Sequence, residues 1–176
     1  MIYEIYKNVR NSSWQCLLEC GINSLPTNLS QICKHYNIRI IKNSSLKENC
    51  LLKNEKAKNM FINGQWYIIV DDFDHITVQR YSIAHEIGHI LLRKDISEYE
   101  AERFAINILA PACVLWGLNL HTAKDISKKC NISILAGQIR AKRMAVLYQR
   151  NKFLTSPLER QVFEQFFDFI KQHKLK

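Results

Sequence analysis

Residues 82–92 read Ser-Ile-Ala-His-Glu-Ile-Gly-His-Ile-Leu-Leu, and they set two histidines four positions apart with a glutamate beside the first. Four residues are about one helical turn, so His85 and His89 share a face and both rings can reach one metal ion. Glu86 is rotated away from that face, where it can take a proton from a water bound to the metal. The pattern predicts a catalytic zinc site on a helix.

The alternative interpretation is a pair of exposed histidines on an ordinary helix. The flanking residues disfavour it, because Ile83, Ala84, Ile87, Ile90 and Leu91 make the helix largely apolar and would leave both imidazoles unsatisfied. A bound zinc ion supplies the missing partner. The helix also contains a glycine between the histidines, which costs about 1 kcal/mol relative to alanine and indicates that something approaches the backbone closely there.

A catalytic zinc site needs a third protein ligand and one open position. The candidates lie just downstream, where Ser97 and Glu100 have the spacing of a capping box that starts a second helix ending near Ala110. The apolar stripe of that helix puts Glu98 nearest the buried face, with Glu100 and Glu102 further round. Periodicity therefore favours Glu98, and on pattern alone Glu100 is equally well explained as a capping residue.

Residues 80–92 read RYSIAHEIGHILL and residues 98–111 read EYEAERFAINILAP. Together they resemble the ImmA/IrrE family of zinc metallopeptidases, in which such a histidine helix is followed by an E-x-E-A-x-x-F-A segment. The resemblance extends over about residues 25–145, with Ala110 where the family often has methionine. It implies that Glu100, the glutamate directly before an alanine, binds zinc together with His85 and His89, and we follow it over the periodicity because helix phase is least reliable in the first turn.

The resemblance implies a zinc-dependent endopeptidase. Zinc would polarise the scissile carbonyl and acidify a water, and Glu86 would take that water's proton and pass it to the leaving amine. A further donor should stabilise the oxyanion, and the sequence does not choose among four candidates: Tyr81, Tyr99, His75 and His121. The implied substrate is a helix-turn-helix transcriptional repressor, often encoded beside the protease in a prophage or other mobile element.

A binding module is the alternative from another functional class. It would be a non-catalytic anti-repressor or a DNA-binding protein that uses the peptidase fold with a structural zinc. A structural site would close its fourth position with cysteine or histidine and would have no use for Glu86. We therefore expect an enzyme.

Length and composition predict one soluble domain. With 176 residues and 47% hydrophobic content, the chain can bury one core, with residues 1–120 as a zinc-peptidase core and 121–176 as a basic helical extension. No apolar run is long enough to cross a membrane, and charges at Glu4, Lys7 and Arg10 interrupt any signal-peptide core, so we expect a cytoplasmic protein. The sequence leaves the oligomeric state open.

The six cysteines are then interpreted as reduced thiols that pack in the core. A second zinc site at Cys16, Cys20, Cys33 and His35 is the weaker alternative, because the spacings are not typical of zinc ligands.

The order of elements predicts an α+β fold, mostly helical, with a small antiparallel sheet and the histidine helix. Asn63-Gly64 predicts a hairpin turn between two paired strands. The expected helices cover residues 2–10, 13–20, 27–36 with Thr27 as N-cap, and 74–92, with later ones capped at Thr122 and Ser156; the expected strands cover residues 38–41, 58–62 and 65–70.

Positive charge is concentrated at the C-terminal end. Residues 121–176 hold 12 Lys and Arg against 4 Asp and Glu, a balance of +8, which leaves +1 of the total of +9 for residues 1–120. Two short helices predicted within residues 124–143 suggest a helix-turn-helix and hence DNA binding. We expect instead that their charged faces recruit the protein partner, through Lys128, Lys129, Arg140, Lys142 and Arg143. The aromatic last helix is expected to be buried.

Overall fold

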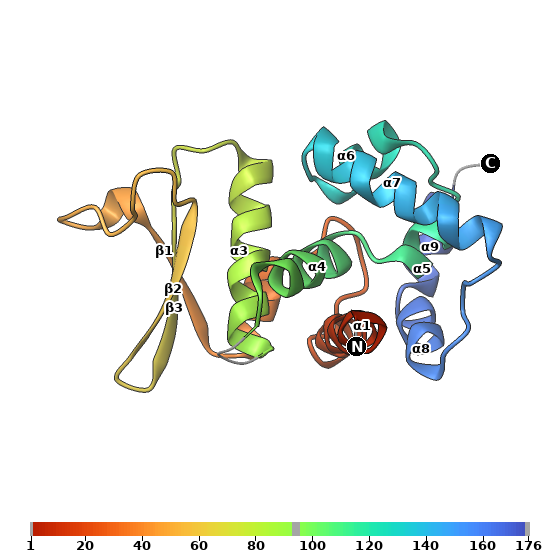
Figure 1. Cartoon of the computed structure of the whole chain (residues 1–176), viewed down its shortest axis with the longest axis horizontal. Helices are drawn as coiled ribbons and strands as arrows, with labels where there is room; N and C mark the ends of the chain where they lie inside the picture. Colours follow the sequence, from red (N-terminus) through yellow and green to blue (C-terminus); the bar gives the residue numbers. More distant parts are fainter. Residues whose placement is uncertain (1, 93–95, 175–176) are drawn as a thin grey trace.

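The computed structural model describes residues 2–92 and 96–174. Its elements follow the predicted α+β order (Figure 1). The helices are α1 (Ile2–Glu19), α2 (Leu29–His35), α3 (Ile76–Leu91), α4 (Glu98–Leu109), α5 (Ala112–Gly117), α6 (Ala123–Cys130), α7 (Ile134–Gln149), α8 (Pro157–Gln165) and α9 (Phe167–His173); the strands are β1 (Ile38–Lys42), β2 (Ala57–Ile62) and β3 (Gln65–Val70), with a 3₁₀ turn at Asn43–Ser45.

The three strands form one sheet in the order β1-β3-β2. The predicted hairpin is confirmed: Asn63 and Gly64 have φ of 49° and 79°, and β2 runs antiparallel to β3 from that turn. The sheet is mixed rather than purely antiparallel, because β1 joins the other side of β3 in parallel. The residue pattern of a strand does not reveal whether it runs parallel or antiparallel to its neighbour. Here the long connection after β1 lets the chain return so that β3 runs parallel to β1. As a result β2 is an edge strand.

Helix α3 lies against the sheet, and α4 packs behind it with α1 on the far side (Figure 1). The contact between α3 and α4 is close at Gly88, where an added Cβ would lie 3.2 Å from Cβ of Phe104 and 3.3 Å from Cα of Ala101. The expected close approach is thus made by a neighbouring helix. This packing fixes the start of α4 beside the histidines.

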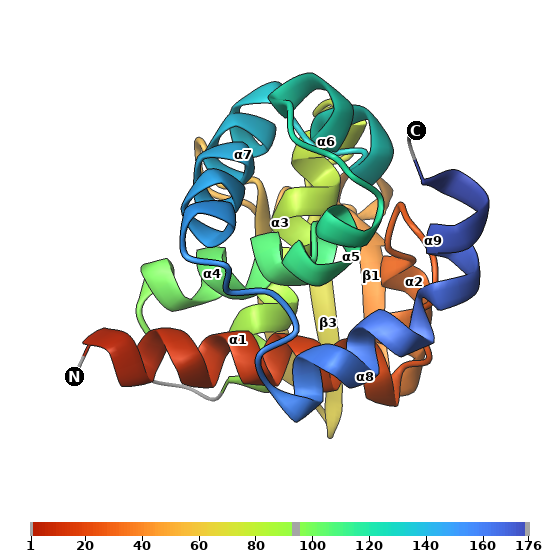
Figure 2. The same cartoon turned by 90° about the vertical axis from the view of Figure 1, so that its right-hand side faces the viewer.

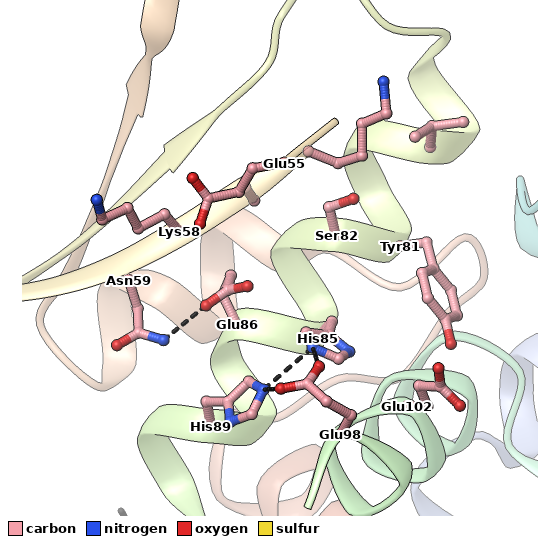
Figure 3. A pocket seen from close by; sticks show the side chains of 13 residues that line it. Glu55, Lys58, Asn59, Tyr81, Ser82, His85, Glu86, His89, Glu98 and Glu102 are labelled. Atoms are coloured by element: carbon pink, nitrogen blue, oxygen red, sulfur yellow. Dashed lines mark hydrogen bonds and ion pairs between the residues drawn. The ribbon is translucent and has the colours of Figure 1, made fainter. Parts of the chain in front are cut away.

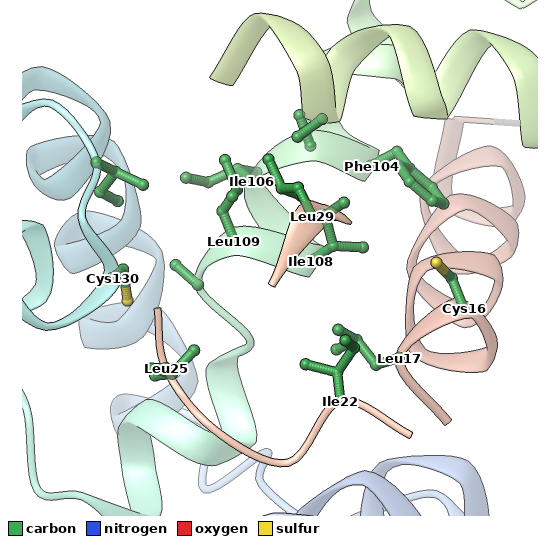
Figure 4. Close-up of a cluster of buried hydrophobic side chains, with 14 of the residues drawn as sticks. Cys16, Leu17, Ile22, Leu25, Leu29, Phe104, Ile106, Ile108, Leu109 and Cys130 are labelled. Atoms are coloured by element: carbon green, nitrogen blue, oxygen red, sulfur yellow. The ribbon is translucent and has the colours of Figure 1, made fainter. Parts of the chain in front are cut away.

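The core lies between α1, α2 and α4 and continues towards the C-terminal helices (Figure 4). Five of the six cysteines are buried and Cys50 is exposed. Thr27 does not cap α2 as expected, since the cap is Asn28, whose side chain accepts from the backbone N–H of Gln31. The Thr27 hydroxyl is buried and donates to the carbonyl of Ile108 instead, so it anchors the loop to α4.

The N-terminal and C-terminal helices differ from the sequence prediction in detail. The two short helices expected at the start are one continuous helix, α1. The aromatic last segment is two helices, and it is only partly buried: Val162, Phe166 and Ile170 are buried, whereas Phe167 is 53% exposed. None of the helices in the described parts of the chain is long and apolar enough to span a membrane.

Helices α6 and α7 form the expected helical pair, joined by a short turn in which Asn131 is left-handed. Their charged residues are not all on the surface. Lys128 and Lys142 are exposed, whereas Arg140 is only 4% exposed and donates to the carbonyl of Ile106 and to Oδ1 of Asn107. The expectation that Arg140 serves a docking face is therefore wrong, because its position on α7 turns it into the protein interior.

Candidate metal centre

Three potential metal ligands converge where α3 meets the first turn of α4 (Figure 3). The Nε2 atoms of His85 and His89 lie 3.1 Å apart. Glu98 reaches across from α4, with Oε2 at 3.1 Å from Nε2 of His85 and Oε1 at 3.4 Å from Nε2 of His89. The histidines are held by a helix packed on both sides, so their relative position is fixed by α3 itself.

These distances fit a shared tetrahedral metal ion. Bonds of about 2.0–2.1 Å to a tetrahedral zinc place ligand atoms about 3.3–3.4 Å from one another. Unprotonated imidazole nitrogens and carboxylate oxygens all carry lone pairs, so they repel one another at these distances. A cation or a proton among them removes that repulsion. Two nitrogens and one carboxylate oxygen are a donor set that suits a borderline ion such as zinc better than magnesium or calcium.

Glu100 is engaged elsewhere. Its Oε2 accepts from the backbone N–H of Ser97 at 2.9 Å and from the Ser97 hydroxyl at 2.8 Å, while the Ser97 Oγ accepts from the Glu100 N–H. This is the predicted capping box, complete in both directions. The structure thus corrects the placement implied by the family resemblance: it brings Glu98 to the histidines, as the apolar stripe of α4 favoured, and leaves Glu100 on the cap.

Glu86 lies beside the ligands but does not join them. It is 9% exposed, and its Oε2 accepts a 2.6 Å hydrogen bond from Nδ2 of Asn59 on β2 (Figure 3). A buried carboxylate needs such a donor, and the bond also fixes the direction in which the carboxylate points. Glu86 is therefore oriented at the metal centre by the edge strand.

The site opens into a cleft of about 610 Å³ between α3 and β2. One wall is the edge strand with Ala57, Lys58 and Asn59, and the other carries the histidines and Glu86. Glu98 is 78% exposed on the open side, whereas the histidine side chains are only 15% and 22% exposed. The cleft is thus open to a large ligand along the strand and leaves one side of the metal position free.

Of the four candidate oxyanion donors, only Tyr81 lines the cleft. Burial raises the pKa of Tyr81 to about 12, so its hydroxyl keeps its proton at neutral pH and remains a donor. The other three are engaged elsewhere: His75 caps α3, Tyr99 stacks on Arg103, and His121 contacts Asn119.

Sequence reasoning missed Asn59. It lies 27 residues before its partner, in a stretch predicted only as a strand. The one available signal was that asparagine is depleted in strand interiors. The weaker alternative of a second zinc site at the cysteines finds no support among the described residues. There, His85, His89 and Glu98 are the one group of three or more His, Cys, Asp or Glu side chains whose ligand atoms converge, and Cys16, Cys20 and Cys33 pack in the core.

Comparison with known proteins agrees with this geometry. A search of curated proteins finds no match. A scan against protein families matches residues 33–140, which include α3, α4 and the whole sheet, to the peptidase family described as having an IrrE N-terminal-like domain. The matched segment is more than half of the chain and holds every residue of the candidate metal centre, and the chain therefore belongs to this IrrE N-terminal-like family of metallopeptidases.

Proposed function

We propose that this protein is a zinc-dependent endopeptidase of the cytoplasm that cleaves a helix-turn-helix transcriptional repressor. The observation that carries the proposal is the arrangement around α3: two histidine nitrogens and a Glu98 oxygen converge, and Glu86 lies beside them in the same cleft without being a ligand. A purely structural zinc site has no place for such a free carboxylate.

Each residue of the site has a separate role in the proposed reaction. His85, His89 and Glu98 would hold zinc, which when bound supplies Lewis-acid polarisation of a carbonyl and acidifies water. Glu86 accepts the proton of the attacking water and returns it to the leaving amine. Asn59 keeps the Glu86 carboxylate in place, and the Tyr81 hydroxyl donates to the oxygen on which charge develops.

The edge strand supports binding of an extended peptide. One side of β2 pairs with β3, and its other side borders the cleft, so its backbone groups can pair with a substrate segment by strand addition. Such pairing would hold the peptide backbone alongside α3, where the scissile carbonyl comes close to the histidines. A folded helix cannot pair in this way, so the cleaved segment must be extended, as in a linker between domains.

Exposed apolar side chains next to the cleft support selection of a protein substrate. Leu52 is 74% exposed and Phe73 is 85% exposed, and both line a hollow that shares Glu55 and Lys56 with the cleft. Large apolar side chains in such positions are typical of binding surfaces. A substrate that runs along β2 past Lys56 would reach them.

The identity of the substrate as a repressor rests on the resemblance to the ImmA/IrrE family, and the surface of α7 favours a protein partner over DNA. Its N-terminal half exposes Ile134, Leu135 and Ile139 at 53%, 63% and 50%. A helix that reads a major groove presents side chains that hydrogen-bond to bases or phosphates there. Apolar side chains at these positions are better suited to another protein.

Cleavage of a repressor encoded by a neighbouring gene tests the proposal. Purified protein loaded with zinc should cut it at one site, measured by mass spectrometry of the products, and Glu86→Gln should retain zinc and fold while cleavage is lost, because an amide cannot take the proton. In cells, the same variant decides between the peptidase and the anti-repressor alternative. If Glu86→Gln still relieves repression fully, binding alone is the function and the peptidase proposal fails.

A further inference from the structure

A second cavity, which shares no lining residue with the metal centre, is lined by residues of α1, α7 and α8. Figure 2 shows these three helices on one face of the protein. Residues of α4 and α5 also contribute to its wall. Its charged side chains are Arg10, Arg140, Arg143, Lys152 and Glu159. Asn107, Tyr6 and Trp14 also line it, and the Tyr6 hydroxyl accepts from Nη2 of Arg143 at 3.1 Å. Four of the five charged side chains are cations and one is an acid, so the cavity has an excess of positive charge.

The positive charges have no ion-pair partner in the described parts of the chain, where no carboxylate oxygen lies within 4.0 Å of a nitrogen of any of the four. Glu159 is directed to the backbone instead, and its Oε2 accepts from the N–H of Thr155 at 3.0 Å. Burial raises the pKa of Glu159, and the neighbouring charge of Arg10 lowers it in part. One carboxylate can balance only one of the four cations, so the cavity keeps an excess of positive charge.

Three hydrogen-bond donors on the cavity wall are buried and unpartnered. They are Nε of Arg140, Nε of Arg143 and Nδ2 of Asn107. Arg140 is the most buried of these, and its Nη2 is already used for the carbonyl of Ile106 and for Oδ1 of Asn107. An unsatisfied buried donor costs about 1–3 kcal/mol, and more when it is charged, so three on one cavity require an acceptor.

The size of the cavity limits that acceptor. It leaves about 30 Å³ for the centre of a water-sized sphere. The cavity is therefore small, with room for a few waters or for one small anion. Water would satisfy the donors but would leave the buried guanidinium charge uncompensated.

We propose that this cavity binds one monovalent anion of halide size, for which chloride is the natural probe. The anion accepts from Nε of Arg140 and Nε of Arg143 on α7 and from Nδ2 of Asn107 on α4. It neutralises part of the positive charge of Arg10 on α1 and of Lys152, which line the same cavity. The site stabilises the packing of the C-terminal helices on the peptidase core and is independent of the catalytic cleft.

Thermal unfolding in chloride tests the proposal. Chloride replaces gluconate, which is too bulky for the cavity, at constant ionic strength, and the unfolding midpoint is measured for three proteins. The wild-type midpoint should rise and saturate, by about 3–6 °C when chloride reaches about ten times its Kd. Arg143→Gln should lose most of this rise. Lys142→Gln, which removes the same charge from an exposed neighbouring position, should keep it.

An equal rise in all three proteins would mean a general ion effect and would overturn the proposal. A rise with acetate but not with chloride would also overturn it, because the cavity would then take a carboxylate group. Crystals grown in bromide give a direct readout that does not depend on the stability of a variant. An anomalous bromide peak in contact with Arg140 and Arg143 supports the site, and ordered water without bromide there contradicts it.

Discussion

Glu98→Gln and Glu100→Gln form a matched pair that tests which glutamate completes the metal site. Both changes replace a carboxylate by an amide of the same shape, two positions apart on α4. The structure places Glu98 within 3.1 Å of a histidine nitrogen and Glu100 on the helix cap. We expect Glu98→Gln to lose zinc and Glu100→Gln to keep it, since glutamine still accepts from Ser97 in a capping box.

The expected size of the effect follows from binding linkage. Zinc at about 100 times its Kd stabilises the wild type by about 2.7 kcal/mol, which raises the unfolding midpoint by about 5–11 °C in a chain of this length. A loss of affinity of about 100-fold in Glu98→Gln leaves zinc near its new Kd. The stabilisation then falls to about 0.4 kcal/mol, or about 1–2 °C.

The assay is the unfolding midpoint with and without added zinc, together with the zinc content of the purified proteins. Glu100→Ala serves as the control for the cap, because removing the capping interaction should lower the midpoint without zinc by about 2–4 °C, for a loss of about 1 kcal/mol, and leave the zinc-dependent rise intact. The reasoning is refuted if Glu100→Gln loses the zinc-dependent rise while Glu98→Gln keeps it.

Four further changes test the rest of the site. Asn59→Ala should lower kcat about tenfold with KM and zinc content unchanged, because the base loses its orienting hydrogen bond; a change confined to KM would contradict this. Tyr81→Phe should lower kcat by about 10²–10³ if its hydroxyl stabilises the oxyanion, and an unchanged kcat would assign that role elsewhere. Gly88→Ala should destabilise the protein by about 1–3 kcal/mol in chemical unfolding, because the new methyl group meets the backbone of α4, and a neutral effect would show that the helices can separate freely. Replacing Lys128 and Lys142 by glutamate should slow repressor cleavage without altering cleavage of a short peptide or zinc content. Equal slowing of repressor cleavage and short-peptide cleavage would mean that these exposed lysines do not form a docking surface.

The placement of His85 and His89 on one helix face with Glu86 beside them could be predicted from the sequence, because that geometry is local. Four residues along a helix place His85 and His89 on one face whatever the helix packs against. The same holds for the hairpin at Asn63-Gly64 and for the Ser97 capping box, where the interacting groups are at most a few residues apart. In each case the backbone geometry of the segment itself decides the outcome.

Which glutamate lies beside the two histidines was decided by the tertiary structure. Sequence pattern and family resemblance favoured different glutamates, and the answer depends on how α4 is rotated about its axis where it crosses α3. That rotation is set by the close contact of Gly88 with Ala101 and Phe104, which lie 13 and 16 residues further along the chain. The phase of the first turn cannot be read from a short amphipathic pattern alone.

Asn59 and Arg140 depend on the tertiary structure even more strongly. Asn59 acts on a glutamate 27 residues away, through the placement of an edge strand beside a helix. Arg140 looks like a surface charge in the sequence, yet α7 packs so that it reaches the carbonyl of Ile106, 34 residues before it. The sequence by itself determined the features whose interacting groups lie close together along the chain: the histidine helix, the hairpin at Asn63-Gly64 and the Ser97 capping box. Only the tertiary structure decided which distant polar groups meet, because those meetings depend on packing orientations that no local pattern encodes.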